Sequence, residues 1–228
     1  MSDTLLSFDD LKCGYGDTEI IHGISGQVSS GQTLGVFGRN GVGKTTLSRV
    51  LIGEIPTLSG SITLNGASVS KDVTHVRRRK GMSYMPQTGM VFDNLTVREN
   101  LSLSSSTADQ DPYFELFPRL AERLDQKAGS MSGGERKILS FVRVMLEETD
   151  VVILDEPSEG VQSENIERMQ ACILEKQKSG CACVLVEQNL TMLMAVTDTY
   201  LGLDSGRVVF EGKRESCLRD NLLEVLSI

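Results

Sequence analysis

A glycine-rich stretch that follows an apolar run constrains the fold of this chain more than any other feature. The run from Leu34 to Phe37 predicts a buried strand, and the segment from Leu47 to Ile52 predicts a helix. The spacing G-x-x-x-x-G-K-T between a strand and a helix is typical of a loop that binds phosphate groups, and both flanking elements argue against a chance glycine-rich turn. The stretch reads Gly38-Arg39-Asn40-Gly41-Val42-Gly43-Lys44-Thr45-Thr46.

The residue types in this loop suit a nucleoside triphosphate. Glycines let the backbone curl so that successive N–H groups point at the phosphates, and the positive end of the following helix adds to that field. We expect Lys44 to reach the outer phosphates and the Thr45 hydroxyl to hold Mg²⁺. The loop therefore predicts a purine nucleoside triphosphate as ligand.

Two adjacent acids follow a second apolar run. Asp155 and Glu156 come directly after Val151 to Leu154, at the carboxyl end of a predicted core strand, where parallel α/β sheets bind ligands. Asp155 is the expected partner of the Mg²⁺ held by Thr45, and Glu156 is left free to polarise an attacking water. Adjacent acids in a turn are often only solvated, but the apolar run and the upstream phosphate loop argue against that alternative.

A second anion-binding element is predicted at the start of a later helix, in the stretch Met131 to Glu135. Ser132 is a natural N-cap, and Gly133 and Gly134 bare two N–H groups at the positive helix end. Because one chain has one triphosphate loop, two such sites suggest that each chain completes its neighbour's site. For these five residues taken alone, an ordinary capped helix stays open.

Length, charge and cysteine usage limit the class of protein. The 228 residues suffice for one large α/β domain and are too few for two complete nucleotide-binding domains. The acidic start lacks a signal sequence and no window approaches eighteen apolar residues, so we expect a cytoplasmic protein. The cysteines form no C-x-x-C pair and are expected to be reduced, packed thiols: Cys13, Cys172, Cys181, Cys183 and Cys217.

The charge distribution argues against nucleic acid as the main partner. The net charge is −8, and the basic residues make no continuous stripe. The one tight basic cluster, Arg77 to Lys80, is expected to be a solvated helix end, although a nucleic-acid contact by the cluster alone stays open.

The order of the predicted elements indicates an α/β fold. Residues 1–37 predict a small antiparallel β layer that leads into the first core strand, and 88–149 predict a helical insertion. Strands and helices then alternate at a spacing that implies a largely parallel sheet covered on both faces. We expect one domain over 1–228, with a core of 1–87 and 150–228 and a helical subdomain of 88–149. The later elements are expected at Thr96 to Leu101, Pro112 to Phe117, Arg119 to Leu124, Ser132 to Glu147, Ser163 to Lys178, Cys181 to Val186, and near Tyr200 and Val208.

These landmarks, taken in order, resemble the ATP-binding subunit of an ABC transporter over essentially all 228 residues. The nine-residue loop resembles the Walker A loop, Asp155-Glu156 the Walker B pair, and Ser132 to Glu135 the signature Leu-Ser-Gly-Gly-Gln. Tyr15, between two glycines, resembles the aromatic residue that stacks on the base, although a hairpin cap is an alternative for it. Gln87 resembles the Q-loop glutamine. The implied fold is a P-loop NTPase core of the ABC ATPase type.

The resemblance implies ATP and Mg²⁺ as cofactors, with Thr45, Gln87 and Asp155 at the metal and Glu156 as the catalytic base. Gln188 stands at the switch position, where most relatives have His, and is the second expected catalytic residue. The nucleotide contacts implied by the resemblance are Tyr15, Gly38, Arg39, Asn40, Gly41, Gly43, Lys44, Thr45, Thr46, Gln87, Ser132, Gly133, Gly134 and Glu135.

The implied assembly is a head-to-tail pair of ATPase subunits, identical or different, on the inner face of the cell membrane. It would drive two transmembrane permease subunits, with a substrate-binding protein acting indirectly and 88–149 docking the permease. Finer features, among them Glu156 to Gly160 and Val186 to Asn189, resemble the smaller ATPase of importers for branched-chain amino acids and urea.

Besides Gln188, the chain departs from the family pattern at three places: Met131 for Leu, Glu135 for Gln, and Gly160-Val161-Gln162 in place of an Asp-ending D-loop. The alternatives are an importer ATPase for urea or another small solute, a soluble ABC ATPase acting on ribosomes or DNA, and a nucleotide-sensing module without turnover. The single acidic unit argues against the second, and the retained Lys44, Asp155 and Glu156 argue against the third.

Overall fold

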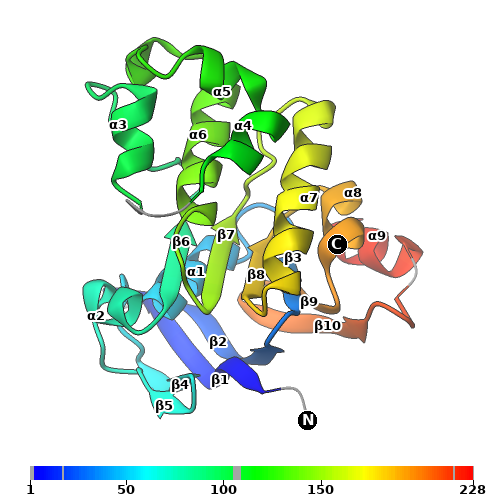
Figure 1. Cartoon of the computed structure of the whole chain (residues 1–228). Helices are drawn as coiled ribbons and strands as arrows, with labels where there is room; N and C mark the ends of the chain where they lie inside the picture. Colours follow the sequence, from blue (N-terminus) through cyan, green and yellow to red (C-terminus); the bar gives the residue numbers. More distant parts are fainter. Residues whose placement is uncertain (1–2, 17, 105–108, 218, 228) are drawn as a thin grey trace.

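A mostly parallel sheet lies at the centre of the computed structural model, which describes residues 3–16, 18–104, 109–217 and 219–227 (Figure 1). Within these residues the sheet has six strands in the order β10-β9-β3-β8-β7-β6. Neighbours pair in parallel except β10, which is antiparallel to β9. The strands are β3 (Thr33–Phe37), β6 (Met82–Met85), β7 (Val151–Asp155), β8 (Ala182–Val186), β9 (Thr199–Asp204) and β10 (Arg207–Lys213).

The central strands β3, β7 and β8 are buried along their whole length because both faces of the sheet are covered. In β7, Val152 and Leu154 belong to one apolar cluster, whereas Val151 and Ile153 belong to the cluster on the opposite face. Alternate side chains of a strand point to opposite faces, so a continuous apolar run feeds two cores at once. The carboxyl end of β7 is thereby held rigidly where the acids begin.

A second, antiparallel sheet forms a separate layer, with strands in the order β2-β1-β4-β5. The layer predicted for residues 1–37 is present, and it also includes two strands from later in the chain. Helix α1 (Lys44–Ile52) packs between the two sheets and contacts strands of both (Figure 1). The strands of this layer are β1 (Thr4–Tyr15), β2 (Thr18–Ser29), β4 (Ser59–Leu64) and β5 (Ala67–Ser68).

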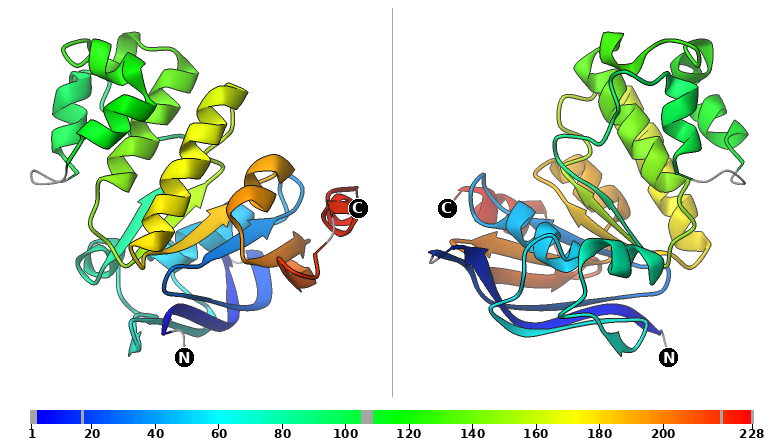
Figure 2. Two further views of the ribbon diagram at one scale, coloured as in Figure 1. Left: turned by 45° about the vertical axis from the view of Figure 1, so that its right-hand side comes forward. Right: turned by 90° about the vertical axis from the view of Figure 1, so that its left-hand side faces the viewer.

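Helices cover the other face of the central sheet and extend beyond its edge. Figure 2 shows α3 to α6 gathered at one end of the molecule, while α7 and α8 lie side by side on the sheet. The predicted α/β fold with an antiparallel layer and a helical part is confirmed. The boundaries at 87 and 150 stay a prediction. The run Ser104-Ser105-Ser106, which predicts a break between the short helices, lies outside the described residues except for Ser104. The helices are α2 (Thr74–Arg79), α3 (Val97–Ser102), α4 (Asp111–Leu116), α5 (Pro118–Glu122), α6 (Gly133–Met145), α7 (Ser163–Lys178), α8 (Leu190–Val196) and α9 (Arg219–Ser227).

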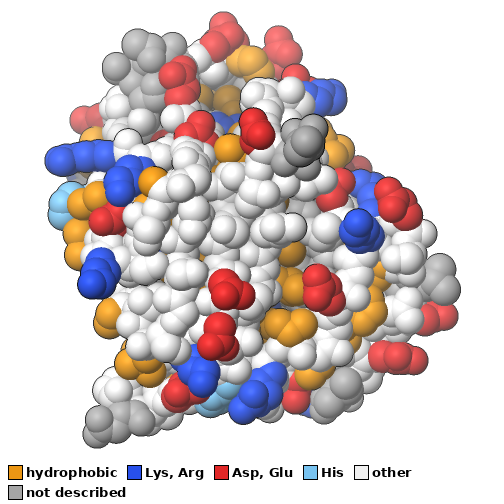
Figure 3. All heavy atoms as spheres, turned by 90° about the horizontal axis from the view of Figure 1, so that it is seen from below, with side chains coloured by type: hydrophobic (Ala, Val, Ile, Leu, Met, Phe, Trp, Pro, Cys, Tyr) orange, Lys and Arg blue, Asp and Glu red, His pale blue; other side chains and the backbone are white. Residues whose placement is uncertain are grey.

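The sequence predicted a solvated basic cluster at the end of α2, and this prediction is wrong for Arg77. Arg77 is only 1% exposed, and its guanidinium donates hydrogen bonds to the carbonyls of Val50 and Leu51 at 2.7 Å and of Asp72 at 2.9 Å. The charge is buried because carbonyls from the end of α1 converge on it, a feature no local pattern reveals. Figure 3 shows basic and acidic side chains interspersed on the face that carries the N-terminal strands.

The cysteines are packed thiols: four of the five are buried, Cys217 is half-buried, and none forms a disulfide. Among the described residues, no helix combines the length and apolar character that crossing a membrane requires.

Candidate functional site

The glycine-rich loop joins β3 to α1, and its shape depends on glycine. Gly38 and Gly43 have positive φ angles of 151° and 106°, and a Cβ on Gly38 would lie 2.3 Å from the Leu203 carbonyl oxygen. Gly43 is the N-cap of α1, which begins at Lys44 rather than at the predicted Leu47. Because glycine has no side chain to cap the helix, the first N–H groups of α1 remain available to an anion.

Lys44 is a buried cation at the mouth of this loop. Its side chain is 4% exposed, and Nζ donates hydrogen bonds of 2.9 Å to the carbonyls of Gly38 and Arg39. The same nitrogen lies 3.3 Å from Glu156 Oε1. The loop thus holds its ammonium group against its own backbone and against a carboxylate from β7.

Asp155 lies beside the hydroxyl that was expected to share a metal with it. Thr45 donates to Asp155 Oδ1 at 3.3 Å, and the Tyr84 hydroxyl donates to Oδ2, also at 3.3 Å. Asp155 is fully buried, and this burial raises its pKa to about 6. The Asp155 carboxylate and the Thr45 hydroxyl provide oxygen ligands of the kind that Mg²⁺ prefers, and a cation would stabilise the buried negative charge. These residues therefore fit Mg²⁺.

Glu156 is the point at which separate segments of the chain meet. Its carboxylate accepts hydrogen bonds of 2.9 Å from the amide nitrogens of Gln87 and Gln188, in addition to its ion pair with Lys44. Its backbone has a positive φ of 47°, a strained conformation for a residue other than glycine. The carboxylate expected to be free is therefore engaged by three donors in this structure.

Gln188 lies between β8 and α8, and its amide nitrogen also donates to Asn40 Oδ1 at 2.7 Å. The next residue, Asn189, supplies the side-chain cap of α8, so Gln188 is not needed for that task. Gln188 thus contacts both the phosphate loop and Glu156.

Glu187, which was not among the predicted site residues, shapes the backbone of this site. Its buried carboxylate accepts N–H groups from Ser158 at 2.8 Å, Gln188 at 2.9 Å and Asn189 at 3.0 Å. It therefore ties the chain after β7 to the chain after β8. An acid at the end of an apolar strand is the signal that pointed to Asp155, and the same signal marks Glu187.

Lys44, Thr45 and Glu156 line a cavity of about 260 Å³. The exposed ring of Tyr15 (47%) forms part of the wall, and its hydroxyl accepts a hydrogen bond of 3.3 Å from Arg49. Pockets that enclose a small ligand measure about 300–1,000 Å³, so the volume of this cavity lies just below that range. Its lining is Tyr15, Ile20, Asn40, Gly41, Gly43, Lys44, Thr45, Thr46, Gln87 and Glu156.

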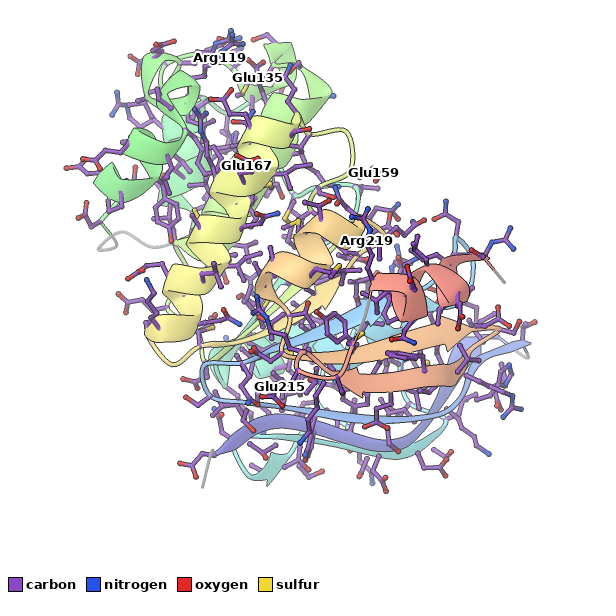
Figure 4. All side chains as sticks on the ribbon, turned by 90° about the vertical axis from the view of Figure 1, so that its right-hand side faces the viewer. Arg119, Glu135, Glu159, Glu167, Glu215 and Arg219 are labelled. Atoms are coloured by element: carbon purple, nitrogen blue, oxygen red, sulfur yellow. The ribbon has the colours of Figure 1, made fainter. Side chains whose placement is uncertain are left out.

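The stretch Ser132 to Glu135 lies elsewhere and lines two other cavities. Ser132 Oγ accepts the Glu135 N–H at 3.3 Å, and Glu135 Oε2 accepts the Ser132 N–H at 3.0 Å. The backbone hydrogen bond from Ser132 is the main cause that lowers the pKa of Glu135, helped by Arg123 at 2.9 Å. Figure 4 shows Glu135 beside Arg119 at the end of the helices, away from the strands.

The signature residues therefore do not meet the phosphate loop within the described residues of one chain. Ser132 and Gly133 are exposed, and a Cβ on Gly133 would meet no atom within 4 Å. Glu135 was expected to contact the nucleotide, but in this structure its carboxylate accepts the Ser132 N–H and forms an ion pair with Arg123.

A glycine loop between strand and helix, facing two strand-end carboxylates, defines a P-loop nucleotide-binding fold. Residues 21–159 match the family described as ABC transporter, and the chain belongs to this family. It is 35% identical to the high-affinity branched-chain amino acid transport ATP-binding protein BraG of Pseudomonas aeruginosa, over 90% of this chain and 91% of that protein. It is 33% identical to the probable branched-chain amino acid transport ATP-binding protein LivF of Archaeoglobus fulgidus, over 95% of each.

A solved structure of an ATP-binding subunit of an ABC transporter shares the fold, with a TM-score of 0.83 and 24% identity over 98% of this chain and all of that one. Family membership makes this chain an ATP-binding and ATP-hydrolysing transporter subunit.

Proposed function

We propose that this chain hydrolyses ATP to energise the import of branched-chain or other hydrophobic amino acids. The observation that carries the proposal is the convergence on Glu156 of donors from three other segments, Lys44, Gln87 and Gln188. The names of the relatives BraG and LivF support the substrate class.

In this proposal the loop N–H groups and Lys44 hold the phosphates, and Tyr15 stacks on the base. Thr45 and Asp155 hold Mg²⁺, which screens phosphate charge when bound. Gln87 is proposed as the third residue that contacts Mg²⁺. In this structure the amide nitrogen of Gln87 donates hydrogen bonds to Glu156 and Glu159, and its amide oxygen takes part in neither bond.

Glu156 is proposed to accept the proton of the attacking water at a carboxylate oxygen. A phosphate that takes over the Lys44 ammonium breaks the Lys44–Glu156 pair of 3.3 Å, so binding itself releases the base. Gln188 offers only a neutral amide, and we propose that it orients the water and the terminal phosphate by hydrogen bonding. Positioning of this kind needs no change in the charge of residue 188.

A second ATPase subunit, identical or different, is proposed to close over the cavity at Lys44. The exposed Ser132 and Gly133 at the start of α6 supply the N–H and hydroxyl groups that such a closure brings to the partner's phosphate. The departure Gly160-Val161-Gln162 adjoins this surface, since Gly160 lines the same two cavities as Gly134.

The surface after Gln87 is proposed to dock a cytoplasmic loop of a transmembrane permease, which places the chain peripherally on the inner face of the membrane. Met90 and Phe92 are large apolar side chains with exposed fractions of 40% and 52% at the start of the segment 88–149. A cysteine at position 92, in a Cys217→Ser background, should cross-link to the permease. A cysteine at the equally exposed Leu58, in the antiparallel layer, is the matched control; equal cross-linking by both would reject this surface.

Uptake measurements test the substrate class. Cells that lack this chain should lose high-affinity uptake of leucine, isoleucine and valine, wild-type protein should restore it, and Glu156→Gln should not. Unchanged leucine uptake together with lost urea uptake would overturn the amino-acid proposal in favour of the urea alternative.

A further inference from the structure

Helix α6 holds the segment that follows β6 by a row of three buried polar side chains at a spacing of three residues. Lys137 Nζ donates to the Gln87 carbonyl at 2.5 Å, and Ser140 Oγ accepts the Met90 N–H at 3.0 Å. Arg143 donates to the Met90 carbonyl, and its guanidinium lies 5.4 Å from the centre of the Phe92 ring. The segment 87–92 is thus fastened to the helix that begins at the signature.

Lys137 differs from the other two because it acts on Gln87 itself. Its ammonium is also 3.8 Å from Glu159 Oε2, and this carboxylate accepts the Gln87 amide nitrogen at 3.3 Å. Gln87 is therefore held at both ends: Lys137 fixes the main chain, while Glu159 and Glu156 share the side-chain amide. Figure 4 labels Glu159 in the segment between β7 and α7.

We propose that Lys137 is a positioning residue for ATP hydrolysis, which fixes the backbone of Gln87 so that its amide stays on Glu156. The proposal rests on the roles proposed above for Gln87 and Glu156. Lys137 is 8% exposed, and a buried ammonium needs its few partners, so the Gln87 carbonyl cannot move without loss of a charge-assisted hydrogen bond. Without Lys137, the Gln87 amide is free to shift from Glu156 towards the exposed Glu159.

A double-mutant cycle tests this, with steady-state ATP hydrolysis by the complex isolated through a tag on this chain. We expect Lys137→Met to lower kcat about 10-fold at unchanged KM for ATP, since small misplacements of positioning groups cost this much or more. In a Gln87→Ala background the same substitution should change kcat less than about 2-fold, because coupled residues are non-additive. Lys137→Arg should restore most of the activity.

Lys176→Met is the matched control. Lys176 is a part-buried lysine that donates to the carbonyls of Met145 and Glu147, at the opposite end of α6 from Ser132. Thermal unfolding of each variant checks that the chain is folded, and Lys176→Met should leave kcat unchanged even where it lowers the melting temperature.

Equal losses from Lys137→Met in both backgrounds, or an equal loss from Lys176→Met, would overturn the role of Lys137. Failure of the proposed function has a different signature, which is unimpaired hydrolysis by Glu156→Gln. If only Gln87→Ala is silent while Lys137→Met is slow, Lys137 does not act through Gln87 and the proposal is rejected.

Discussion

Helices α1 and α6 were both predicted to bind an anion at their N-termini, and their N-cap residues are Gly43 and Ser132, yet the two helix starts differ in structure. Helix α1 has Gly43 as its N-cap and no side-chain cap, and buried charges, Lys44 among them, surround it. Helix α6 begins with a reciprocal cap between Ser132 and Glu135, and Ser132 and Gly133 at this start are exposed to solvent. The start of α1 leaves its backbone N–H groups available to a ligand bound by the same chain. The start of α6 is capped by its own side chains and faces outwards.

The two helix starts also differ in stability. A reciprocal cap stabilises a helix by about 1 kcal/mol, so α6 needs no ligand to be formed. The site at α1 instead contains an ionised pair, a buried acid and a strained Glu156 backbone, features that cluster where binding or catalysis uses them. The comparison predicts that damage at the start of α1 affects nucleotide chemistry within one chain, whereas damage at Ser132, at the start of α6, affects hydrolysis only in the assembled pair.

The largest effect is expected from Glu156→Gln. The amide keeps the hydrogen-bonding shape but cannot accept the proton, so turnover should fall about 10²–10⁴-fold while ATP binding is retained. A closed pair of subunits should accumulate, visible as a dimer in size-exclusion chromatography with ATP. Glu164→Gln, an exposed acid on α7, is the control. Hydrolysis by Glu156→Gln near the wild-type rate would remove the base from this position.

Ser132→Arg tests the other half of the comparison. Its bulk and charge should prevent closure of two chains, so hydrolysis should fall at least about 10²-fold, as when an oxyanion donor is lost. Binding of ATP to the monomer should stay within about 2-fold of wild type, because Ser132 lines none of the cavity at Lys44. Ser130→Arg, two residues earlier, is the control. An equal loss of monomer binding would mean that the two halves belong to one site within the chain.

The features that sequence predicts well here are those written in a few adjacent residues. The loop around Lys44, the strand-end acids and the cap of α6 each depend on local spacing, and the structure places each in the expected strand, loop or helix. The buried Arg77 and the role of Lys137 depend on carbonyls from other segments, and Glu187, although a strand-end acid, depends in part on the Ser158 N–H after β7. Such partners have no local signature, because folding alone decides which backbone groups come close.

Gln188→Ala should have a smaller effect than the changes at Glu156 and Ser132. Loss of the amide that contacts Glu156 and Asn40 should lower kcat about 10-fold and spare ATP affinity, because the lost bond matters most as charge develops. Wild-type turnover should lack an inflection between about pH 6 and 8, and Gln188→His should introduce one near the reference histidine pKa of about 6.5. Hydrolysis by Gln188→Ala at the wild-type rate would show that residue 188 is not a switch.

The smallest effect is one of stability, and its sign should differ between the two helix starts. Burial raises the pKa of Asp155 to about 6, so the folded chain binds this proton more tightly than the unfolded chain, and ionising Asp155 costs stability as the pH rises from about 4 to about 6. Asp155→Asn should therefore stabilise the nucleotide-free chain at pH 7.5 by on the order of 2 kcal/mol, or roughly 5 °C, and by nothing near pH 4.

Glu135 should behave in the opposite way, because the hydrogen bond from Ser132 lowers its pKa. Its contribution is present above the unfolded pKa and is lost as the pH falls through the lowered folded value. Glu135→Gln should therefore lower the melting temperature at pH 7.5, and the difference should vanish in acid; the shift should be smaller than at Asp155, since charges at a helix end near the surface are screened by water. Melting curves of both variants from pH 4 to pH 7.5 measure the two signs together. Shifts of the same sign would mean that the helix starts do not differ in electrostatics and that the contrast between them is one of shape alone.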